Sequence, residues 1–251
     1  MTAPMPYSYP QPLDKATIYR EWKHILPGAM ALAGTAGYIN SIVLGFFATP
    51  VSHMSGAVSH LGLDIAQGKG HQAYTSLLII IGFLFGSVLA GMFVGATKLG
   101  PSRRYGTVLM LEGVLLLGST LLLLRNSVEG TMLAATACGL QNAMSSSYCG
   151  LMIRTTHVSG IVTDMGVMLG HWLRHRRIVT WKLKFLVALL VSFGMGGIIG
   201  ASLNMRYGPA CLLIAATGCF IAGAIFFMLM QQNQNEIEES VLPRTSIFPN
   251  D

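Results

Sequence analysis

A ten-residue stretch that occurs twice constrains the fold of this chain more than any other feature. Residues 53–62 read HMSGAVSHLG and residues 157–166 read HVSGIVTDMG, with five of the ten positions identical and no gap. Upstream, GYIN at 37–40 matches GLQN at 139–142. Internal repetition indicates that a chain is built from copies of one structural unit. We therefore expect two related halves, with a working site where the two copies meet.

Long apolar runs indicate the environment in which these halves fold. Only 10% of the residues are charged, 52% are hydrophobic, and the mean hydropathy is +0.57. Soluble domains carry roughly 25% charged residues. A helix of about 20 apolar residues spans the hydrocarbon core of a membrane. Six runs of that length predict an integral membrane protein, and they cover residues 26–48, 74–96, 105–124, 130–152, 183–204 and 209–230.

Lysine and arginine are distributed unevenly around these six runs. If the N-terminus lies in the cytoplasm, twelve of them fall at cytoplasmic ends and three at outer ends. This positive-inside bias sets the orientation of membrane helices. We expect a multi-pass membrane protein with both termini in the cytoplasm. Residues 1–24 would then form a disordered tail and residues 231–251 a polar tail.

Each half contains three runs, so residues 25–125 form membrane repeat 1 and residues 126–230 form membrane repeat 2. Because three is an odd number, the second half would cross the membrane in the opposite sense. Inverted repeats of this kind place a transported solute near the midplane, between the halves. The predicted fold class is an all-α integral membrane protein. It has six transmembrane helices in two inverted three-helix repeats, each with a broken or re-entrant HxSG segment.

The repeated HxSG segments are expected to interrupt the membrane helices. Pro50 cannot continue the first helix, and residues 55–67 could form a helix too short to span the bilayer. Ser55, Thr156 and Ser159 are residue types that cap helix starts. The free backbone N–H groups of such starts attract anions and polar ligand groups.

Small residues recur every four positions in the second run of each half, which predicts close helix packing. Aligning the halves pairs Phe85-Gly86 with Phe193-Gly194 at an offset of 108 residues. The spaced glycines are Gly82 and Gly86 in the first half, and Gly196 and Gly200 in the second.

Polar groups inside a membrane are costly and become candidates for function. A histidine near an aspartate can change its charge near neutral pH, which suits proton coupling. The alternative is a polar cluster that only ties helices together. The predicted solute-binding residues are Asn40, His53, Ser55, Gly56, Gln141, Asn142, Thr156, His157, Ser159 and Gly160. The predicted proton-coupling residues are His53, His60, Asp64, His157 and Asp164.

Further charged residues receive structural interpretations. Glu112 and Arg154 are predicted to form a buried ion pair, whose disruption would leave an unpaired charge; recognition of a charged ligand is the alternative. The basic stretch 171–184 reads HWLRHRRIVTWKLK. We interpret it as a cytoplasmic anchor with interfacial tryptophans that contacts anionic lipid.

Several classes of function are disfavoured. The four cysteines form no CxxC pair, which argues against a zinc or redox motif, so no metal or cofactor is expected. A metal site drawn from the histidines and aspartates lacks tight ligand spacing. Duplication in inverted orientation suits the two gates of a transporter better than the single catalytic centre of an intramembrane serine hydrolase. We therefore expect no enzyme. No basic run of the nucleic-acid-binding type occurs, so nucleic acid is not expected as a partner. Assembly of two copies into a homodimer is an alternative that the sequence leaves open.

The stretch GLQNAMSSSYCGLMIRTTHVSGIVTDMG at 139–166, together with GYIN at 37–40 and FFATPVSHMSG at 46–56, resembles the YoaK family of bacterial membrane proteins. The likeness covers most of residues 28–230. It implies six spans and an inner-membrane location, and it supplies no substrate. The family pattern would place an acidic residue at Asn40.

The leading hypothesis is a small secondary-transporter-like protein. It would move a small polar or anionic solute, with or without protons, between its two inverted repeats. The rival hypothesis is a membrane scaffold or interaction protein whose polar clusters are structural.

Overall fold

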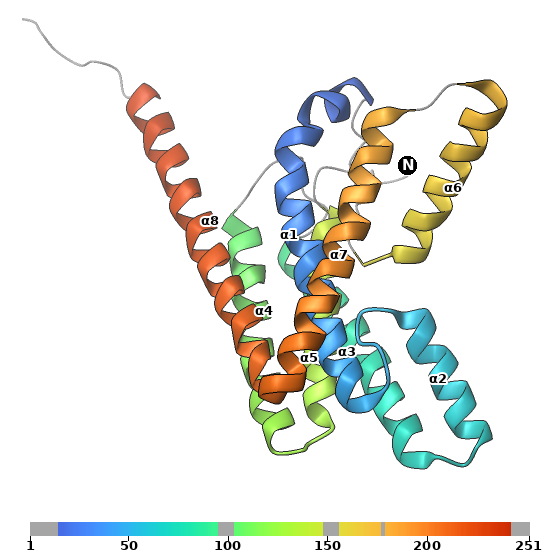
Figure 1. Ribbon diagram of the computed structural model, residues 1–251. Helices are drawn as coiled ribbons and strands as arrows, with labels where there is room; N and C mark the ends of the chain where they lie inside the picture. The colour runs from blue at the N-terminus through green and yellow to red at the C-terminus, as the bar shows by residue number, and fades with distance from the viewer. Residues whose placement is uncertain (1–14, 95–102, 148–155, 177–178, 242–251) are drawn as a thin grey trace, which may run out of the picture.

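The computed structural model describes residues 15–94, 103–147, 156–176 and 179–241. No strand occurs in these residues, and the chain forms a bundle of helices (Figure 1). The helices are α1 (Lys15–Phe47), α2 (Met54–Ala66), α3 (Gly70–Val94), α4 (Arg103–Leu124), α5 (Glu129–Ser147), α6 (Val158–His175), α7 (Thr180–Tyr207), the short 3-10 helix η2 (Gly208–Cys211) and α8 (Leu212–Val241).

Four stretches of the described residues are long and apolar enough to cross a membrane. They are Ile25–Phe47, Gly70–Phe93, Arg104–Leu124 and Thr180–Leu229. The fourth has 50 residues and contains two helices, α7 and the apolar part of α8, joined by η2. Large apolar side chains are exposed on these helices, among them Leu84, Ile198 and Met228. The apolar helices indicate a multi-pass membrane protein, as the sequence predicts.

Helix α5 overlaps the predicted run 130–152 but is not among the four apolar stretches. It contains Gln141 and Asn142, and every residue from 130 to 145 is buried or half-buried. It lies between α3 and α4 and also contacts α1. Because neighbouring helices cover it, its side chains need not be as apolar as those facing lipid.

Glycines allow two pairs of helices to pack closely. Helix α1 packs along α7, and α3 packs along α5. A Cβ atom added at Gly86 would overlap the Thr136 carbonyl group, and one at Gly196 would overlap the Gly34 carbonyl group. The close packing predicted for the spaced glycines is therefore present.

The register of this packing corrects the sequence alignment of the second runs. Thr136 and Gly34 are equivalent at the 102-residue offset of the GYIN and GLQN motifs. Their partners, Gly86 and Gly196, are therefore equivalent at an offset of 110 residues rather than 108. Gly194, the partner assigned by sequence, has no atom near its missing Cβ.

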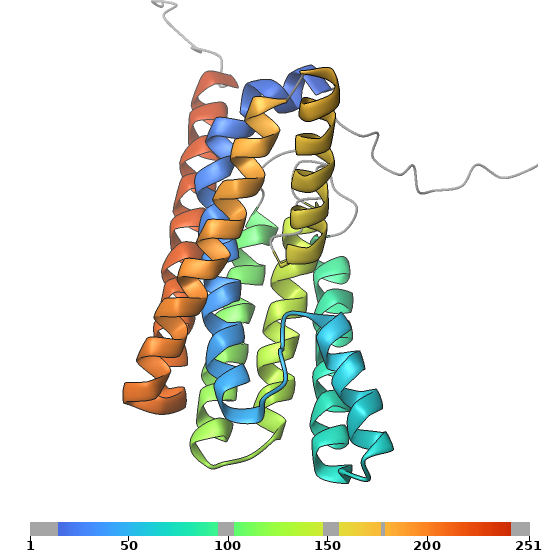
Figure 2. The same cartoon turned by 45° about the vertical axis from the view of Figure 1, so that its right-hand side comes forward.

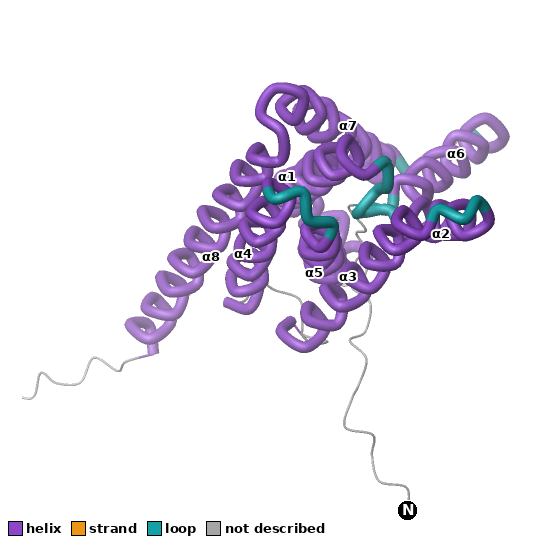
Figure 3. Tube along the Cα trace, turned by 90° about the horizontal axis from the view of Figure 1, so that it is seen from below, coloured by secondary structure: helices purple, strands orange, loops and turns teal. Residues whose placement is uncertain are grey.

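The third pair of helices, α4 and α8, runs side by side in opposite directions (Figure 1). Gly106 meets Gly223, and Gly113 meets Ala216, so one number rises as the other falls. Viewed from below, α4 and α8 form one edge of the bundle, and α2 and α6 extend from the other side (Figure 3).

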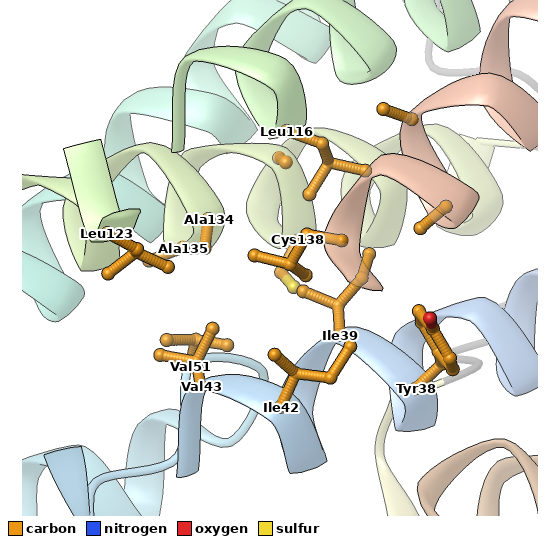
Figure 4. Packing of buried hydrophobic residues seen from close by; sticks show 14 of the residues in the cluster. Tyr38, Ile39, Ile42, Val43, Val51, Leu116, Leu123, Ala134, Ala135 and Cys138 are labelled. Atoms are coloured by element: carbon orange, nitrogen blue, oxygen red, sulfur yellow. The ribbon is translucent and has the colours of Figure 1, made fainter. Parts of the chain in front are cut away.

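The main apolar core lies where α1, α4, α5 and α8 meet. Ile39 and Ile42 of α1 point toward Leu116 of α4 and Cys138 of α5 (Figure 4). All four side chains are fully buried. This core fixes α1 against α5, and so positions the polar residues that follow in both helices.

The predicted disordered tail of residues 1–24 is wrong from Lys15 onward, because α1 begins there. Trp22 packs against Trp181 of α7, with ring centroids 6.3 Å apart, and this contact stabilises the extension. The start of the tail, residues 1–14, lies outside the described residues. At the other end, α8 continues through the predicted polar tail to Val241.

Candidate functional site

Helices α2 and α6 begin immediately after the repeated histidines, and α6 is the longer of the two, with 18 residues. Helix α2 has 13 residues, about 20 Å of helix, which is too short to span a bilayer. It starts near mid-height of the bundle, and α6 starts near the same level and runs the opposite way (Figures 1 and 2). The short helix predicted over 55–67 is thus confirmed as Met54–Ala66. The arrangement turns the N-terminal ends of α2 and α6 toward each other.

An asparagine forms a hydrogen bond with the residue that directly precedes each repeated histidine. Asn40 Oδ1 accepts a hydrogen bond of 3.1 Å from the Ser52 backbone N–H. Asn142 Oδ1 accepts one of 2.7 Å from the Thr156 hydroxyl. Asn40, Ser52 and Thr156 are buried. The predicted Asn40 and Asn142 therefore accept hydrogen bonds at corresponding positions, from a backbone N–H in the first copy and from a hydroxyl in the second.

His53 lies at the meeting point of the two copies. Its Nδ1 atom is 3.0 Å from the Ser52 hydroxyl, and its ring meets the edge of Phe193 of α7 at 5.3 Å between centroids. It lies outside the four apolar stretches. Burial and the positive charge available to His157 lower the pKa of His53 below its ordinary value. The shift of the His53 pKa thus includes a contribution from the other repeated histidine.

The predicted capping of α2 and α6 is wrong. The N-cap residues are His53 and His157, and neither side chain caps its helix with a hydrogen bond. Ser55 and Ser159 lie in the first turns and are exposed. Because their hydroxyls are already inside the helix, they are badly placed to cap it; their carbonyls accept bonds from the Ser59 and Thr163 hydroxyls.

Glycines complete the two starts differently. The added Cβ at Gly56 would touch the Pro50 ring, whereas at Gly160 it would overlap the His157 imidazole. The first glycine lets the chain between α1 and α2 fold back on the helix. The second lets His157, which is exposed, turn back over its own first turn.

The predicted proton-coupling aspartates are not beside the repeated histidines. Asp164 follows His157 by two turns, about 10 Å along α6. It forms an exposed ion pair of 3.3 Å with Lys182 of α7. Asp64, near the end of α2, is buried. His60, one turn before Asp64 on the same helix, is half-buried. The structure therefore divides the predicted proton-coupling residues into separate locations.

A cavity of about 840 Å³ lies between the α1–α7 pair and the α4–α8 pair, and sequence reasoning missed it. Its wall is mostly apolar and includes Tyr38, Gln141 and Cys219. Gln141 donates from Nε2 to the Leu32 carbonyl at 3.4 Å, and its buried Oε1 has no partner among the described residues. Gln141 thus faces this cavity, whereas the neighbouring Asn142 binds Thr156.

Glu112 lies in the middle of α4 and is fully buried. Its predicted ion-pair partner, Arg154, lies outside the described residues. The buried thiols of Cys138 and Cys219 are close enough to interact electrostatically with the carboxyl group. No local sequence signal places these three groups together, because each comes from a different helix.

Other predicted features are placed only in part. In the described residues no group of three histidine, cysteine or acidic side chains could hold a metal ion. Within the basic stretch 171–184, Arg176 lies over the Trp172 ring at 5.7 Å. Lipid contact by this stretch stays a prediction, and residues 177–178 lie outside the described part.

Comparison with known proteins yields one match. The model of a family described as "Protein of unknown function (DUF1275)" matches residues 28–237. No curated protein and no solved structure matches the chain.

Proposed function

The chain belongs to the DUF1275 family, which is the YoaK family of membrane proteins, and from this premise we propose that it is a small secondary transporter. It has six membrane spans in two inverted repeats and moves a small polar or anionic solute between them. It lies in the inner membrane with both termini in the cytoplasm, and it is not an enzyme. The observation that carries this proposal is the meeting of the two histidine-led helix starts.

The packing of the helices supports the six-span arrangement. The four apolar stretches hold five helices, and α5, shielded by its neighbours, is the sixth. Its 19 residues give about 28 Å of helix, close to the thickness of the hydrocarbon core. The first span of each half packs along the second span of the other half, α1 with α7 and α5 with α3. Equivalent glycines make both contacts, as two copies of opposite orientation would.

The chemistry of the two helix starts supports a solute with negative charge or acceptor groups. The N-terminus of a helix carries a partial positive charge and free N–H groups. Two such starts face the same region, and His53 and His157 stand at their N-caps. Protonation of either imidazole adds positive charge there. A proton taken up by a histidine would strengthen the binding of an anion, so proton binding and anion binding would be coupled.

A proton-linked anion uptake assay tests the proposal. The full chain is reconstituted in liposomes, and uptake of a panel of small organic and inorganic anions is measured with and without a pH gradient. We expect uptake of at least one anion, with loss of that uptake when His53 and His157 are both replaced by alanine. A double variant that transports as well as the parent chain would overturn the proposed roles of the histidines.

Thiol labelling separates a transporter from a scaffold. Single cysteines at Ser55 and Ser159, in a chain without native cysteines, are probed from each side with an impermeant reagent. Ser202, exposed on α7 and facing lipid in this proposal, is the matched control. Labelling at Ser55 and Ser159, reduced by the transported anion, supports a shared aqueous site. Protection of both positions in every condition would favour the scaffold.

A further inference from the structure

Glu112 is a carboxyl group in the centre of the bundle without a charged partner in the described residues. Its side chain is 0% exposed, and neither carboxyl oxygen accepts a hydrogen bond of ordinary geometry from the described residues; the thiol of Cys219, a weak donor, lies beside it. The ion pair found among the described residues joins Asp164 to Lys182 and does not involve Glu112. Within the part of the chain that the structure describes, the carboxyl group is therefore removed from water without a compensating charge.

Two thiols are the titratable groups that face Glu112 from the helices packed on α4. Cys138 comes from α5 and Cys219 from α8, and both are buried. A thiol is a weak hydrogen-bond donor and cannot replace water around an ionised carboxylate. The other described elements against α4 are α3 and η2. Their titratable groups lie at the ends of those elements: His71, Tyr74 and Cys211.

The protonation state of Glu112 follows from these surroundings. An ionised carboxylate that is buried without a partner is disfavoured by several kcal/mol, and such a group takes up a proton instead. Buried carboxyl groups in membrane helices are accordingly common carriers of protons. The core around Glu112 includes Leu116 and Ala216, which offer no polar atom from their side chains.

The cavity gives this carboxyl group a nearby route to water. Cys219 interacts with Glu112 and also forms part of the cavity wall. Cys219 is therefore adjacent both to the carboxyl group and to the cavity.

We propose that Glu112 is a proton-binding site, which holds its proton in the packed core and exchanges it with water in the adjoining cavity. The proton leaves a carboxyl oxygen for a water molecule in the cavity, and the carboxylate is then hydrated. Its use in driving solute movement rests on the transport function proposed above. The binding of the proton itself does not.

Infrared spectroscopy of the full chain in lipid tests the site directly. A protonated carboxyl group has a C=O band that is distinct from carboxylate bands and shifts in D2O. We expect this band at neutral pH in the parent chain and its loss in Glu112→Gln. The matched control is Glu129→Gln, because Glu129 is exposed and accepts a hydrogen bond from the Ser127 hydroxyl; this variant should keep the band.

Two further variants guard against misfolding and against a chance band. Glu112→Asp should keep a protonated carboxyl band at a changed frequency, and Cys219→Ala should shift the band because a neighbouring dipole is removed. Absence of the band in the parent chain would overturn the proposal and favour an ionised Glu112 paired with a cation such as Arg154. Persistence of the band in Glu112→Gln would also overturn it.

A transport measurement separates this proposal from the proposed function. If an anion is transported, Glu112→Gln should lose uptake driven by a pH gradient but keep uptake driven by the anion gradient. Unchanged pH-driven uptake in Glu112→Gln would overturn the coupling role. If the Glu112 band is present and no solute is moved, the proton site stands and the transport function fails.

Discussion

The Asn142 side chain accepts a hydrogen bond of 2.7 Å from the Thr156 hydroxyl, directly before the histidine that starts α6. Asn40 makes the corresponding contact with Ser52 at 3.1 Å, directly before the histidine that starts α2. Helices α1 and α5 thus hold the N-terminal ends of α2 and α6. We infer that the two asparagines position the histidines, and that the imidazoles are the groups presented to a solute.

Removal of the Asn142 tie should destabilise the chain. The hydrogen bond joins two polar groups away from water, so Asn142→Ala should lower the free energy of unfolding by about 1–3 kcal/mol. Thr156→Val should have a similar effect. The double variant should cost less than the sum, with a coupling of about 0.5–1.5 kcal/mol. Unfolding in mild detergent measures all three, and strictly additive effects would show that the contact does not stabilise the protein.

The register of the glycines makes a prediction that distinguishes neighbouring positions. Gly196→Ala places a methyl group into the Gly34 carbonyl of α1 and should destabilise the α1–α7 pair by about 2 kcal/mol or more. Gly194→Ala, two residues earlier, meets no atom and should be neutral or slightly stabilising. Thermal unfolding of the two variants compares them. Equal destabilisation by both would contradict the 110-residue equivalence.

Gly86→Ala provides the same test in the other half. The added methyl would overlap the Thr136 carbonyl of α5, and we expect a loss comparable to that of Gly196→Ala. Gly91→Ala on the same helix has open space and is the control. A neutral Gly86→Ala would show that α3 and α5 do not approach as closely as described.

The pKa of His53 predicts a pH dependence of stability. The folded chain lowers this pKa from its ordinary value of 6.5, so the unfolded chain binds the proton more tightly. The contribution of His53 is therefore complete above pH 6.5 and is lost as the pH falls toward the lower folded pKa. Unfolding measured from pH 8 to pH 5 should show this decline, reduced in His53→Gln. The exposed His71→Gln is the control, and an unchanged slope in His53→Gln would contradict the assignment.

Asp164 should contribute little to stability. Asp164 pairs with Lys182, and the two side chains are 54% and 46% exposed, respectively. Exposed ion pairs contribute at most about 1 kcal/mol to stability. Asp164→Asn should shift the unfolding midpoint only slightly, and high salt should abolish the difference. In the transport assay the variant should retain pH-driven uptake, because Asp164 lies two turns from His157. Loss of that uptake would restore Asp164 as a proton-coupling residue.

The sequence by itself determined the all-helical class, the approximate ends of the long apolar stretches and the start of α2. These features depend on local hydropathy and on residues such as Pro50, which act within a few positions of the chain. The repeat also indicated that His53 and His157 occupy equivalent positions, each directly before a helix. Such properties need no knowledge of which helix lies against which.

Only the tertiary structure decided which surfaces pack together. The partner of Gly86 is a carbonyl 50 residues away, and the fit depends on the depth of both helix surfaces rather than on matching letters. The shielding of α5, the isolation of Glu112 between two thiols, and the cavity beside Gln141 likewise arise from several helices at once. Burial is a property of the assembled neighbours, because a residue loses its water only when other segments cover it.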